Sequence, residues 1–414
     1  MPVVREQRAD RDDPGSDGPR IGRVTRPLEH LRILDLSRLL PGPYCTLLFA
    51  DLGADVIKVE EPGKGDYIRW MPPMAGEVSS GLLALNRGKR SITLSLKHPE
   101  GVAAMKRLAR TADVVLESFR PGVMDRLGVG YDALSKENER LVYCALTGFG
   151  QDGPYNMRAG HDINYLGYAG VLDIIGERGG PPVVPGVQIA DVGGGGLMAA
   201  VGILAALSER DRTGRGRFVD ISMMDGAVSW LQMHAQAYAM TGVIPARGTM
   251  RLSGGPACYR IYRAGDGKYV TVGALEPQFW AALCEALGVP DLIEQQYAPE
   301  EEQAVMHKRL EEIFLQKTRD EWVAELSHLD ACFGPVNDLA EAMEDPHARA
   351  RGMVMEVPTP EGPVATVGNP LKLVGDEQPP PTPAPGLGEH TDEILKEAGF
   401  TAEEIQDLRS AGAL

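Results

Sequence analysis

The chain has 414 residues, of which 43% are hydrophobic and 24% are charged, and its formal net charge is -16 at pH 7. This composition is typical of a folded globular protein with two or three packing units, and it argues against a fibrous or disordered chain. The negative charge argues against nucleic acid as the main partner, because binding a phosphate backbone requires a clustered basic surface.

The cysteines, the histidines and the N-terminus restrict the function further. The five cysteines are scattered and form no C-x-x-C pair, which fits a reducing compartment and argues against structural zinc. The eight histidines show no H-E-x-x-H or H-x-H spacing, so we expect no metal. We expect a cytoplasmic protein with no membrane partner, since we find neither a secretory signal nor an apolar run as long as a membrane span. Residues 1–27 are polar and predict a flexible tail.

The first half of the chain predicts an α/β fold. Apolar runs at 31–37 and 55–62 indicate buried strands, and residues 41–54 between them have helical spacing. A strand–helix–strand unit of this length is the seed of a parallel sheet. The same order returns at 90–119, and a further strand is expected within 141–150.

Two acids at the end of the second strand resemble part of a dinucleotide-binding site. Glu60 and Glu61 lie there, in the position of a ribose-binding acid. The first turn, however, reads SRLLPGPYC and lacks the G-x-G-x-x-G that brings the backbone close to a pyrophosphate. The sequence therefore disfavours NAD binding.

The second half predicts a buried helix at 192–208, a strand at 217–223 and a helix at 224–240. From Tyr259 the pattern changes to a hairpin around a GDG turn, and helices follow. A Pro-rich stretch at 377–390 is expected to run extended over a surface. The expected units are a large α/β domain at 28–225, a linker helix region at 226–254, a small α+β domain at 255–345 and a return segment at 346–414, whose residues 360–414 complete the large domain.

Two titratable residues and a glycine run offer chemistry. His161 follows a Gly, and the imidazole side chain can move a proton near neutral pH. Asp191 stands directly before VGGGG and the apolar helix, where the helix N-terminus favours negative charge. The glycines 193–196 allow close approach of a substrate, and their N–H groups could face an oxyanion.

Taken residue by residue, a plainer interpretation stays open. His161 is then a hydrogen-bonded loop histidine, Asp191 is only a helix cap, and the glycines serve helix packing. Asp162 and Glu276 are then solvated acids.

Several longer motifs share one resemblance. They are GHDINY, IADVGGGGLM, GILAALSERDRTGRGRFVDISMMDG, VGALEPQFW, LLFADLGADVIKVEEPGKGD, LNRGKRSITLSLK, ESFRPGVMDRLGVGYDAL and LGEHTDEIL. Together they span nearly everything from Leu31 to Leu395, and they resemble the class III CoA-transferase (CaiB/BaiF) family. Within that family they look like the α-methylacyl-CoA racemase branch.

The resemblance implies a Rossmann-like large domain plus a smaller α+β domain, in two chains interlocked as a homodimer. The active site then lies between the large domain of one subunit and the small domain of the other. It implies an acyl-CoA substrate and no cofactor beyond the CoA moiety, with no metal. The implied CoA-binding positions are Lys58, Leu85, Asn86, Lys89, Arg90, Arg120, Arg126 and Tyr165.

Two mechanisms share this scaffold. In the racemase mechanism, the positions of His161 and Asp191 flank the α-carbon, one removing its proton and the other returning one to the opposite face. Gly193, Gly194 and Gly195 then stabilise the enolate oxygen, and Asp162 and Glu276 support the bases. In the transferase mechanism, Asp191 is a nucleophile that passes CoA between carboxylic acids through an aspartyl-CoA thioester.

The motifs favour the first mechanism without excluding the second. The pair GHDINY and GALEPQF favours proton transfer. LNRGKRSITLSLK resembles the transferases, and LSGGPACY places Ser253 where racemases of this type usually carry an Asp. We therefore expect a 2-methylacyl-CoA racemase, with a CoA-transferase as the alternative. A non-catalytic CoA-binding protein is the third possibility.

Overall fold

A computed structural model describes residues 26–359, 362–373 and 381–414, so all but the last two residues of the expected tail lie outside the described part. Its centre is a six-stranded sheet in the order β5-β2-β1-β6-β7-β8, in which every neighbouring pair is parallel. Counted along the chain this is the 3-2-1-4-5-6 order of doubly wound dinucleotide-binding folds. The strands are β1 (Arg32–Asp35), β2 (Asp55–Glu60), β5 (Arg90–Thr93), β6 (Val114–Glu117), β7 (Val142–Thr147) and β8 (Phe218–Ser222).

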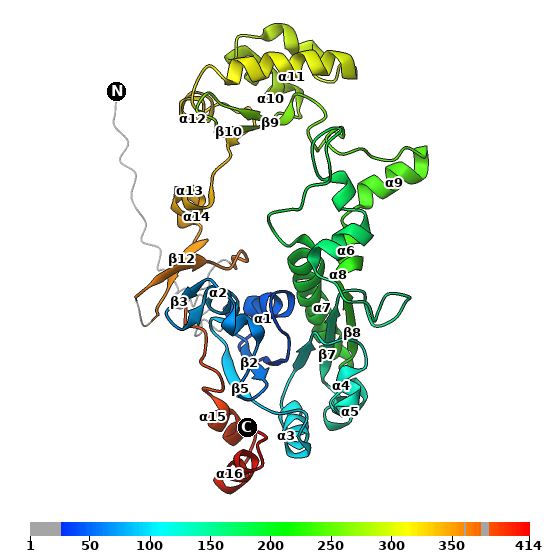
Figure 1. Ribbon diagram of the computed structural model, residues 1–414, viewed down its shortest axis with the longest axis vertical. Coiled ribbons are helices and arrows are strands. Elements are labelled where there is room, and N and C mark those ends of the chain that lie inside the picture. Colours follow the sequence, from blue (N-terminus) through cyan, green and yellow to red (C-terminus); the bar gives the residue numbers. More distant parts are fainter. Residues whose placement is uncertain (1–25, 360–361, 374–380) are drawn as a thin grey trace, which may run out of the picture.

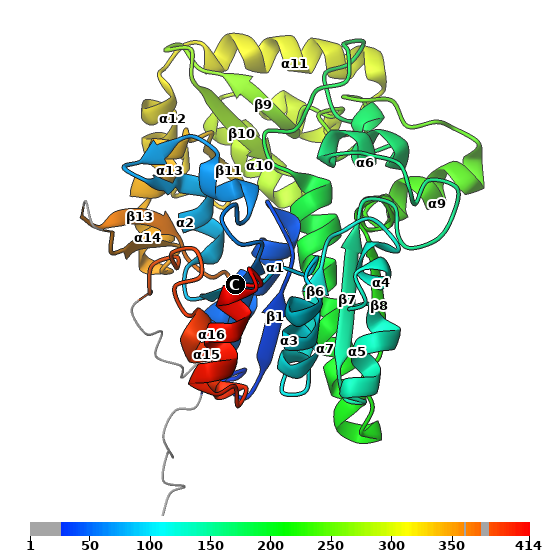
Figure 2. The ribbon, with the colours of Figure 1, turned by 60° about the horizontal axis from the view of Figure 1, so that its bottom comes forward.

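Helices cover both faces of this sheet, as the continuous apolar strands require. Neighbouring residues of β1 enter different cores: Ile33 packs with α1 (Pro41–Asp51) and α7 (Met198–Thr213), whereas Leu34 packs on the opposite face. That second face is covered by α3 (Pro99–Ala109), α5 (Tyr131–Glu137), α15 (Thr391–Glu397) and α16 (Ala402–Ser410). Figure 2 shows these four helices in front of the sheet and α7 behind it. The C-terminus thus completes the second core.

The expected buried helix extends over Ile189–Thr213, as a π-helical segment, Ile189–Leu197, followed by α7. By length and composition alone it is long and apolar enough to cross a membrane, which corrects the expectation that the chain has no such run. Half of its most apolar window is buried, and Ala199, Ile203 and Leu207 lie in the core beside the sheet. These contacts are those of a core helix.

The chain beyond the large unit, which is built on the parallel sheet, forms a second and smaller unit, called the small unit below. It has its own core and an antiparallel sheet in the order β11-β10-β9. The expected hairpin forms β9 (Tyr259–Arg263) and β10 (Tyr269–Gly273), and β11 (Phe333–Pro335) adds a strand that the sequence did not predict. Its helices are α10 (Pro277–Ala286), α11 (Glu300–Phe314) and α12 (Arg319–Leu326). The indole N–H groups of Trp280 and Trp322 are satisfied by the backbone carbonyls of Leu292 and Phe314.

Two separate connections join the units, and Figure 1 shows them on opposite sides of the molecule. The outgoing one passes through α8 (Met223–Ser229) and α9 (Gln232–Thr241), which replace the single helix expected at 224–240. The returning one passes through α13 (Leu339–Glu344), α14 (Pro346–Ala350) and the hairpin β12 (Val354–Val357) and β13 (Val364–Val367). The described part of the Pro-rich stretch then lies on the large unit, where the carbonyl of Pro385 accepts a hydrogen bond from Arg69.

The large unit also contains several short elements. They are α2 (Ser80–Asn86), the β3–β4 hairpin (Met74–Ala75 and Val78–Ser79), α4 (Val123–Arg126) and α6 (Asp162–Ala169). Of these, α4 and α6 follow the carboxyl ends of β6 and β7, where open parallel sheets bind ligands.

Candidate functional site

Two neighbouring cavities open at the carboxyl ends of the parallel strands. The strand-end cavity, of about 450 Å³, is lined by residues that follow β1, β2 and β5, among them Lys64. The His161 cavity, of about 590 Å³, is lined by His161, Asp191 and residues that follow β6 and β7. Arg38, Tyr67 and Phe119 line both cavities, so the two share a wall. This arrangement suits an elongated ligand.

Arg38 occupies the shared wall with its charge unmatched. Its guanidinium lies 4.9 Å from the ring centre of Phe119 and 5.5 Å from that of Tyr67. Three more cations, Lys64, Arg120 and Arg158, also line the cavities. Within the described residues, none of these three and Arg38 forms an ion pair with an acid. Lys97, which also lines the strand-end cavity, does pair with an acid, Glu61. In a chain with a net charge of -16, such a concentration of free cations favours an anionic ligand.

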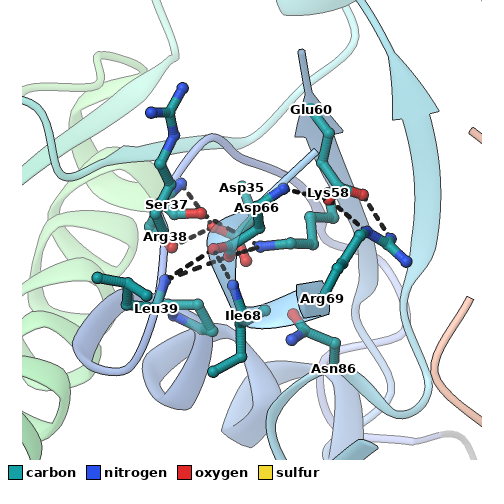
Figure 3. A network of polar contacts seen from close by, with 12 residues as sticks. Asp35, Ser37, Arg38, Leu39, Lys58, Glu60, Asp66, Ile68, Arg69 and Asn86 are labelled. Atoms are coloured by element: carbon teal, nitrogen blue, oxygen red, sulfur yellow. Dashed lines mark hydrogen bonds and ion pairs between the residues drawn. The ribbon is translucent and has the colours of Figure 1, made fainter. Parts of the chain in front are cut away.

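A buried polar network holds the shared wall in place (Figure 3). The ammonium group of Lys58 lies 2.8 Å from a carboxylate oxygen of Asp66, and both side chains are buried. The same carboxylate accepts hydrogen bonds from the backbone N–H groups of Leu39, at 3.2 Å, and Ile68, at 3.1 Å. Leu39 has a φ of 62°, a left-handed conformation that costs a non-glycine residue energy. Asp66 thereby fixes the turn that carries Arg38.

A second arm of the network attaches the C-terminal return. Arg69 donates to both carboxylate oxygens of Glu60, at 2.7 and 2.6 Å, and to the carbonyl of Pro385 at 3.0 Å. Burial alone would raise the pKa of Glu60, but the hydrogen bonds from Arg69 and the charge of Lys58 hold it below its usual value. The motif KVEEPGKGDYIR thus supplies two buried ion pairs beneath the cavities, Lys58–Asp66 and Arg69–Glu60, called the ionic brace below.

His161 and Asp191 reach their cavity from two different elements. His161 lies directly before α6, where its backbone N–H donates to the side-chain oxygen of Asn164 at 3.0 Å, and its imidazole is exposed. Asp191 lies in the first turn of the π-helical segment. Both side chains line the His161 cavity. An imidazole and a carboxyl group therefore line the same space.

Asp162 connects these two elements. One of its carboxylate oxygens accepts the backbone N–H groups of Ala190, at 2.7 Å, and Asp191, at 3.0 Å. Burial raises the pKa of Asp191 to about 6, with a further contribution from the negative charge of Asp162 and a partial offset from His161. Asp162 thus positions Asp191 and makes it a stronger proton acceptor.

These cavities lie in a chain whose relatives can be recognised. The model of CoA-transferase family III matches residues 28–391. The chain belongs to this family. Human α-methylacyl-CoA racemase is 39% identical over 389 residues, covering 92% of this chain and 96% of that protein. Human succinyl-CoA:glutarate CoA-transferase is 34% identical over 397 residues, covering 94% of this chain and 90% of that protein. A crystal structure of a CaiB/BaiF family protein from Brucella suis superposes with a TM-score of 0.79 at 35% identity, covering 90% of this chain and 99% of that one.

In this member of CoA-transferase family III, four of the expected CoA-binding residues have other partners. Lys58 and Lys89 are fully buried; Lys89 donates to Thr46, Asn86 and Asp35. Arg90 pairs with Asp55, Glu393 and Glu397. None of the five residues Lys58, Leu85, Asn86, Lys89 and Arg90 lines either cavity. Their expected contacts with CoA stay a prediction.

Two of the expected positions line a cavity, and a third lies next to one in the chain. Arg120 and Tyr165 line the His161 cavity, and Arg126 is exposed at the end of α4, between the lining residues Val123 and Leu127 of the strand-end cavity. The Tyr165 hydroxyl donates to the carbonyl of Gly160 at 2.5 Å. Burial, with the nearby acids, raises the pKa of Tyr165 to about 12, so it stays a neutral phenol.

The glycine run packs a helix and does not face the cavity. A Cβ on Gly193 would lie 2.3 Å from the Trp230 ring, and one on Gly194 would lie 2.7 Å from the carbonyl of Met223. Gly195 is buried in the same way, and none of the three lines the His161 cavity. These contacts fit the packing interpretation, and the role of the glycines as an oxyanion loop stays a prediction.

Glu276 lies apart from the other candidates. It is the exposed residue directly before α10 in the small unit, and it lines neither cavity. A single chain therefore brings His161, Asp191 and Asp162 together but leaves Glu276 outside. Within the described ranges, no group of three or more His, Cys, Asp or Glu residues is placed to hold a metal ion.

Four residues at or beneath the cavities were not predicted from the sequence: Arg38, Lys64, Arg158 and Asp66. Arg38 carries a usable signal, since it lies in the turn after the first strand, where doubly wound folds bind ligand phosphates. Asp66 carries none that spacing reveals, because its partner Lys58 meets it only after the loop folds back.

Proposed function

We propose that this member of CoA-transferase family III epimerises 2-methylacyl-CoA thioesters by moving the proton on C2. The observation that carries the proposal is the pairing of His161 and Asp191 in one cavity from two elements. Imidazole exchanges protons near neutral pH, and the pKa of about 6 gives Asp191 the same ability. The 39% identity with human α-methylacyl-CoA racemase supports the same reaction.

In the proposed reaction one base takes the C2 proton, so that the C–H bond breaks and its electrons pass into the enolate of the thioester. The second base then gives its proton to the opposite face of C2, and the carbonyl forms again. Two bases on opposite faces are required because one base returns the proton to the face it came from. Asp162 supports the reaction by positioning the Asp191 backbone and raising its pKa.

The CoA moiety is proposed to lie along the shared wall. Its phosphates would face Arg38, Lys64 and Arg126 near the strand-end cavity, and its thioester would enter the His161 cavity beside Arg120 and Tyr165. Guanidinium groups suit phosphates because they donate two parallel hydrogen bonds. The reaction needs no metal or redox cofactor. The five cysteines are free thiols, which fits the reducing cytoplasm proposed as its location.

We further propose that two chains form an interlocked homodimer in which the partner supplies Glu276 to the His161 cavity. The outgoing connection exposes Met233 (74%), Met240 (77%) and Ile244 (72%), and the returning one exposes Leu339 (78%). Apolar surface of this extent marks a protein interface. Light scattering of the full chain should give twice the monomer mass; a monomer that racemises at full rate would contradict this assembly.

A CoA-transferase is the second candidate. Its support is the half-buried carboxylate of Asp191 at a helix start, together with relatives such as the human succinyl-CoA:glutarate CoA-transferase. In that reaction Asp191 attacks the donor thioester, and His161 is not needed. A non-catalytic CoA-binding protein, the third candidate, would perform neither reaction.

Single variants separate these candidates. His161→Ala should abolish racemisation of (2R)-2-methylacyl-CoA, whereas it would spare much of a CoA transfer. Asp191→Asn should abolish both reactions, and His328→Ala, at an exposed histidine of the small unit, serves as the matched control. Racemisation at the wild-type rate in His161→Ala would contradict the two-base proposal.

A further inference from the structure

The shared wall includes two turns, one after β1 that carries Arg38 and one after β6 at residues 118–120. The Ser118 hydroxyl accepts the backbone N–H of Arg38 at 3.2 Å, and the Phe119 ring lies against the Arg38 guanidinium. Arg120 lines the His161 cavity. A shift of the second turn would therefore move a hydroxyl, a ring and two cations of the wall together.

Glu117, the last residue of β6, fixes this second turn from behind. It is 5% exposed, and one of its carboxyl oxygens accepts the backbone N–H of Phe119 at 2.6 Å. Asp66 holds the backbone of Leu39 in the first turn in the same way. Glu117 lines neither of the two cavities, so it can act on a ligand there only through the turn that it holds.

The two acids differ in how their charge is balanced. Asp66 pairs with Lys58, whereas no cation in the described part of the chain forms an ion pair with Glu117. The small cavity beside Glu117, of about 200 Å³, is lined by two further acids, Asp125 and Asp132, and by no lysine or arginine of the described ranges. An ionised Glu117 would therefore be a buried charge without compensation, which is costly.

The proton that Glu117 keeps resolves this cost. Burial raises the pKa of Glu117 to about 8, against the hydrogen bond from Phe119 and with a smaller contribution from Asp125. A neutral carboxyl group still accepts a hydrogen bond through its carbonyl oxygen. At neutral pH, Glu117 thus holds the turn without placing a negative charge behind a wall whose free cations attract an anion.

We propose that Glu117 is a positioning residue for the CoA moiety: by holding the Phe119 backbone it keeps Arg38 and Arg120 where the ligand binds. This inference rests on the proposed binding of CoA along the shared wall. The hydrogen-bond acceptor is what the turn requires, and the charge is not. Glutamine, which keeps a carbonyl oxygen at similar reach, should therefore replace Glu117, whereas methionine, which fills the space without such an acceptor, should not.

Two variants at this position test the proposal at pH 7. Glu117→Met leaves the buried N–H of Phe119 unpaired, and it should raise the Kd for CoA in calorimetry and the KM for (2R)-2-methylacyl-CoA about tenfold. The kcat should stay nearly unchanged, because His161 and Asp191 are held by Asn164 and Asp162 instead. Glu117→Gln should restore both Kd and KM to nearly the wild-type values.

Glu139→Met is the matched control, because Glu139 is an exposed glutamate of the large unit that lines neither cavity. It should leave Kd, KM and kcat unchanged. Thermal unfolding shows whether each variant is folded, and Glu117→Ala, which also lacks the acceptor, replaces Glu117→Met if that variant does not fold.

Two results would overturn the proposal while leaving the proposed function intact. One is a folded Glu117→Met that binds CoA as tightly as the wild type. The other is a Glu117→Gln that loses as much affinity as Glu117→Met, which would show that the charge matters and the acceptor does not. A wild type that binds no CoA would instead contradict the proposed function, and this inference with it.

Discussion

Replacing Asp66 by Asn removes one charge from the brace under the shared wall while keeping the size of the side chain. The Lys58 and Asp66 side chains are 0% and 1% exposed, and their charged atoms lie 2.8 Å apart. Breaking a buried pair by removing one partner costs about 3 to 5 kcal/mol, because the remaining charge stays buried. Asp35 and Glu60 also face the Lys58 ammonium. We therefore expect a loss near the lower limit, about 3 kcal/mol.

The free energy of unfolding in urea measures this loss. Adding Lys58→Met to Asp66→Asn should recover part of the stability, since no uncompensated charge is then left inside. Arg309→Gln removes the exposed ion pair with Asp291 and should cost far less stability, because exposed ion pairs are screened by water and contribute little. Asp66→Asn should also weaken CoA binding, because Asp66 holds the Leu39 backbone beside Arg38. A stability loss in Asp66→Asn no larger than that of Arg309→Gln would refute this reasoning.

Three further predictions follow from burial and packing. The rate of racemisation should fall below pH 6, where Asp191 takes up a proton. This proton also stabilises the fold: its contribution to the free energy of unfolding is complete below pH 3.8 and is lost as the pH rises through 6. Asp191→Asn should lack this pH dependence in urea titrations. Burial raises the pKa of Glu117 to about 8, so Glu117→Gln should be more stable than the wild type by about 2 to 4 kcal/mol at pH 8, but not at pH 4, in urea titrations. A Cβ on Gly226 would lie 2.1 Å from the carbonyl oxygen of Gly194, so Gly226→Ala should lower the free energy of unfolding by about 3 kcal/mol or more. Gly186→Ala should not lower it, because the space around Gly186 is open.

The sequence predicted the parallel sheet because both faces of each strand are apolar. Ile33 and Leu34 are adjacent in the chain yet enter opposite cores, which is why the strands appear as uninterrupted apolar runs. The strand order is a property of long-range pairing, and no local pattern in β1 indicates that β6 rather than β5 is its second neighbour.

Helix boundaries failed where tertiary packing decides them. The expected helix at 224–240 breaks at Trp230, whose ring fills the space left by the absent Cβ of Gly193. A helical apolar pattern cannot indicate such a contact between residues almost forty positions apart.

The candidate site was predicted in part. The motif resemblance singled out His161, Asp191 and Asp162, which lie together, although the bridge from Asp162 to the backbone of Asp191 was not foreseen. The burial of Lys58 and Lys89 was not foreseen, because basic residues in the sequence suggest an exposed surface for phosphates. Burial of a lysine depends on acids such as Asp35 and Asp66 that meet it only in the folded chain.

The most direct test of the central claim is proton exchange at C2 in deuterated water. The full chain is given (2R)-2-methylacyl-CoA as its only substrate, with no free carboxylic acid present. Two-base racemisation predicts deuterium at C2 together with loss of optical purity, at a rate that depends on His161. Absence of deuterium at C2, followed by CoA transfer once succinate is added, would contradict the proposed epimerisation and assign Asp191 the role of nucleophile.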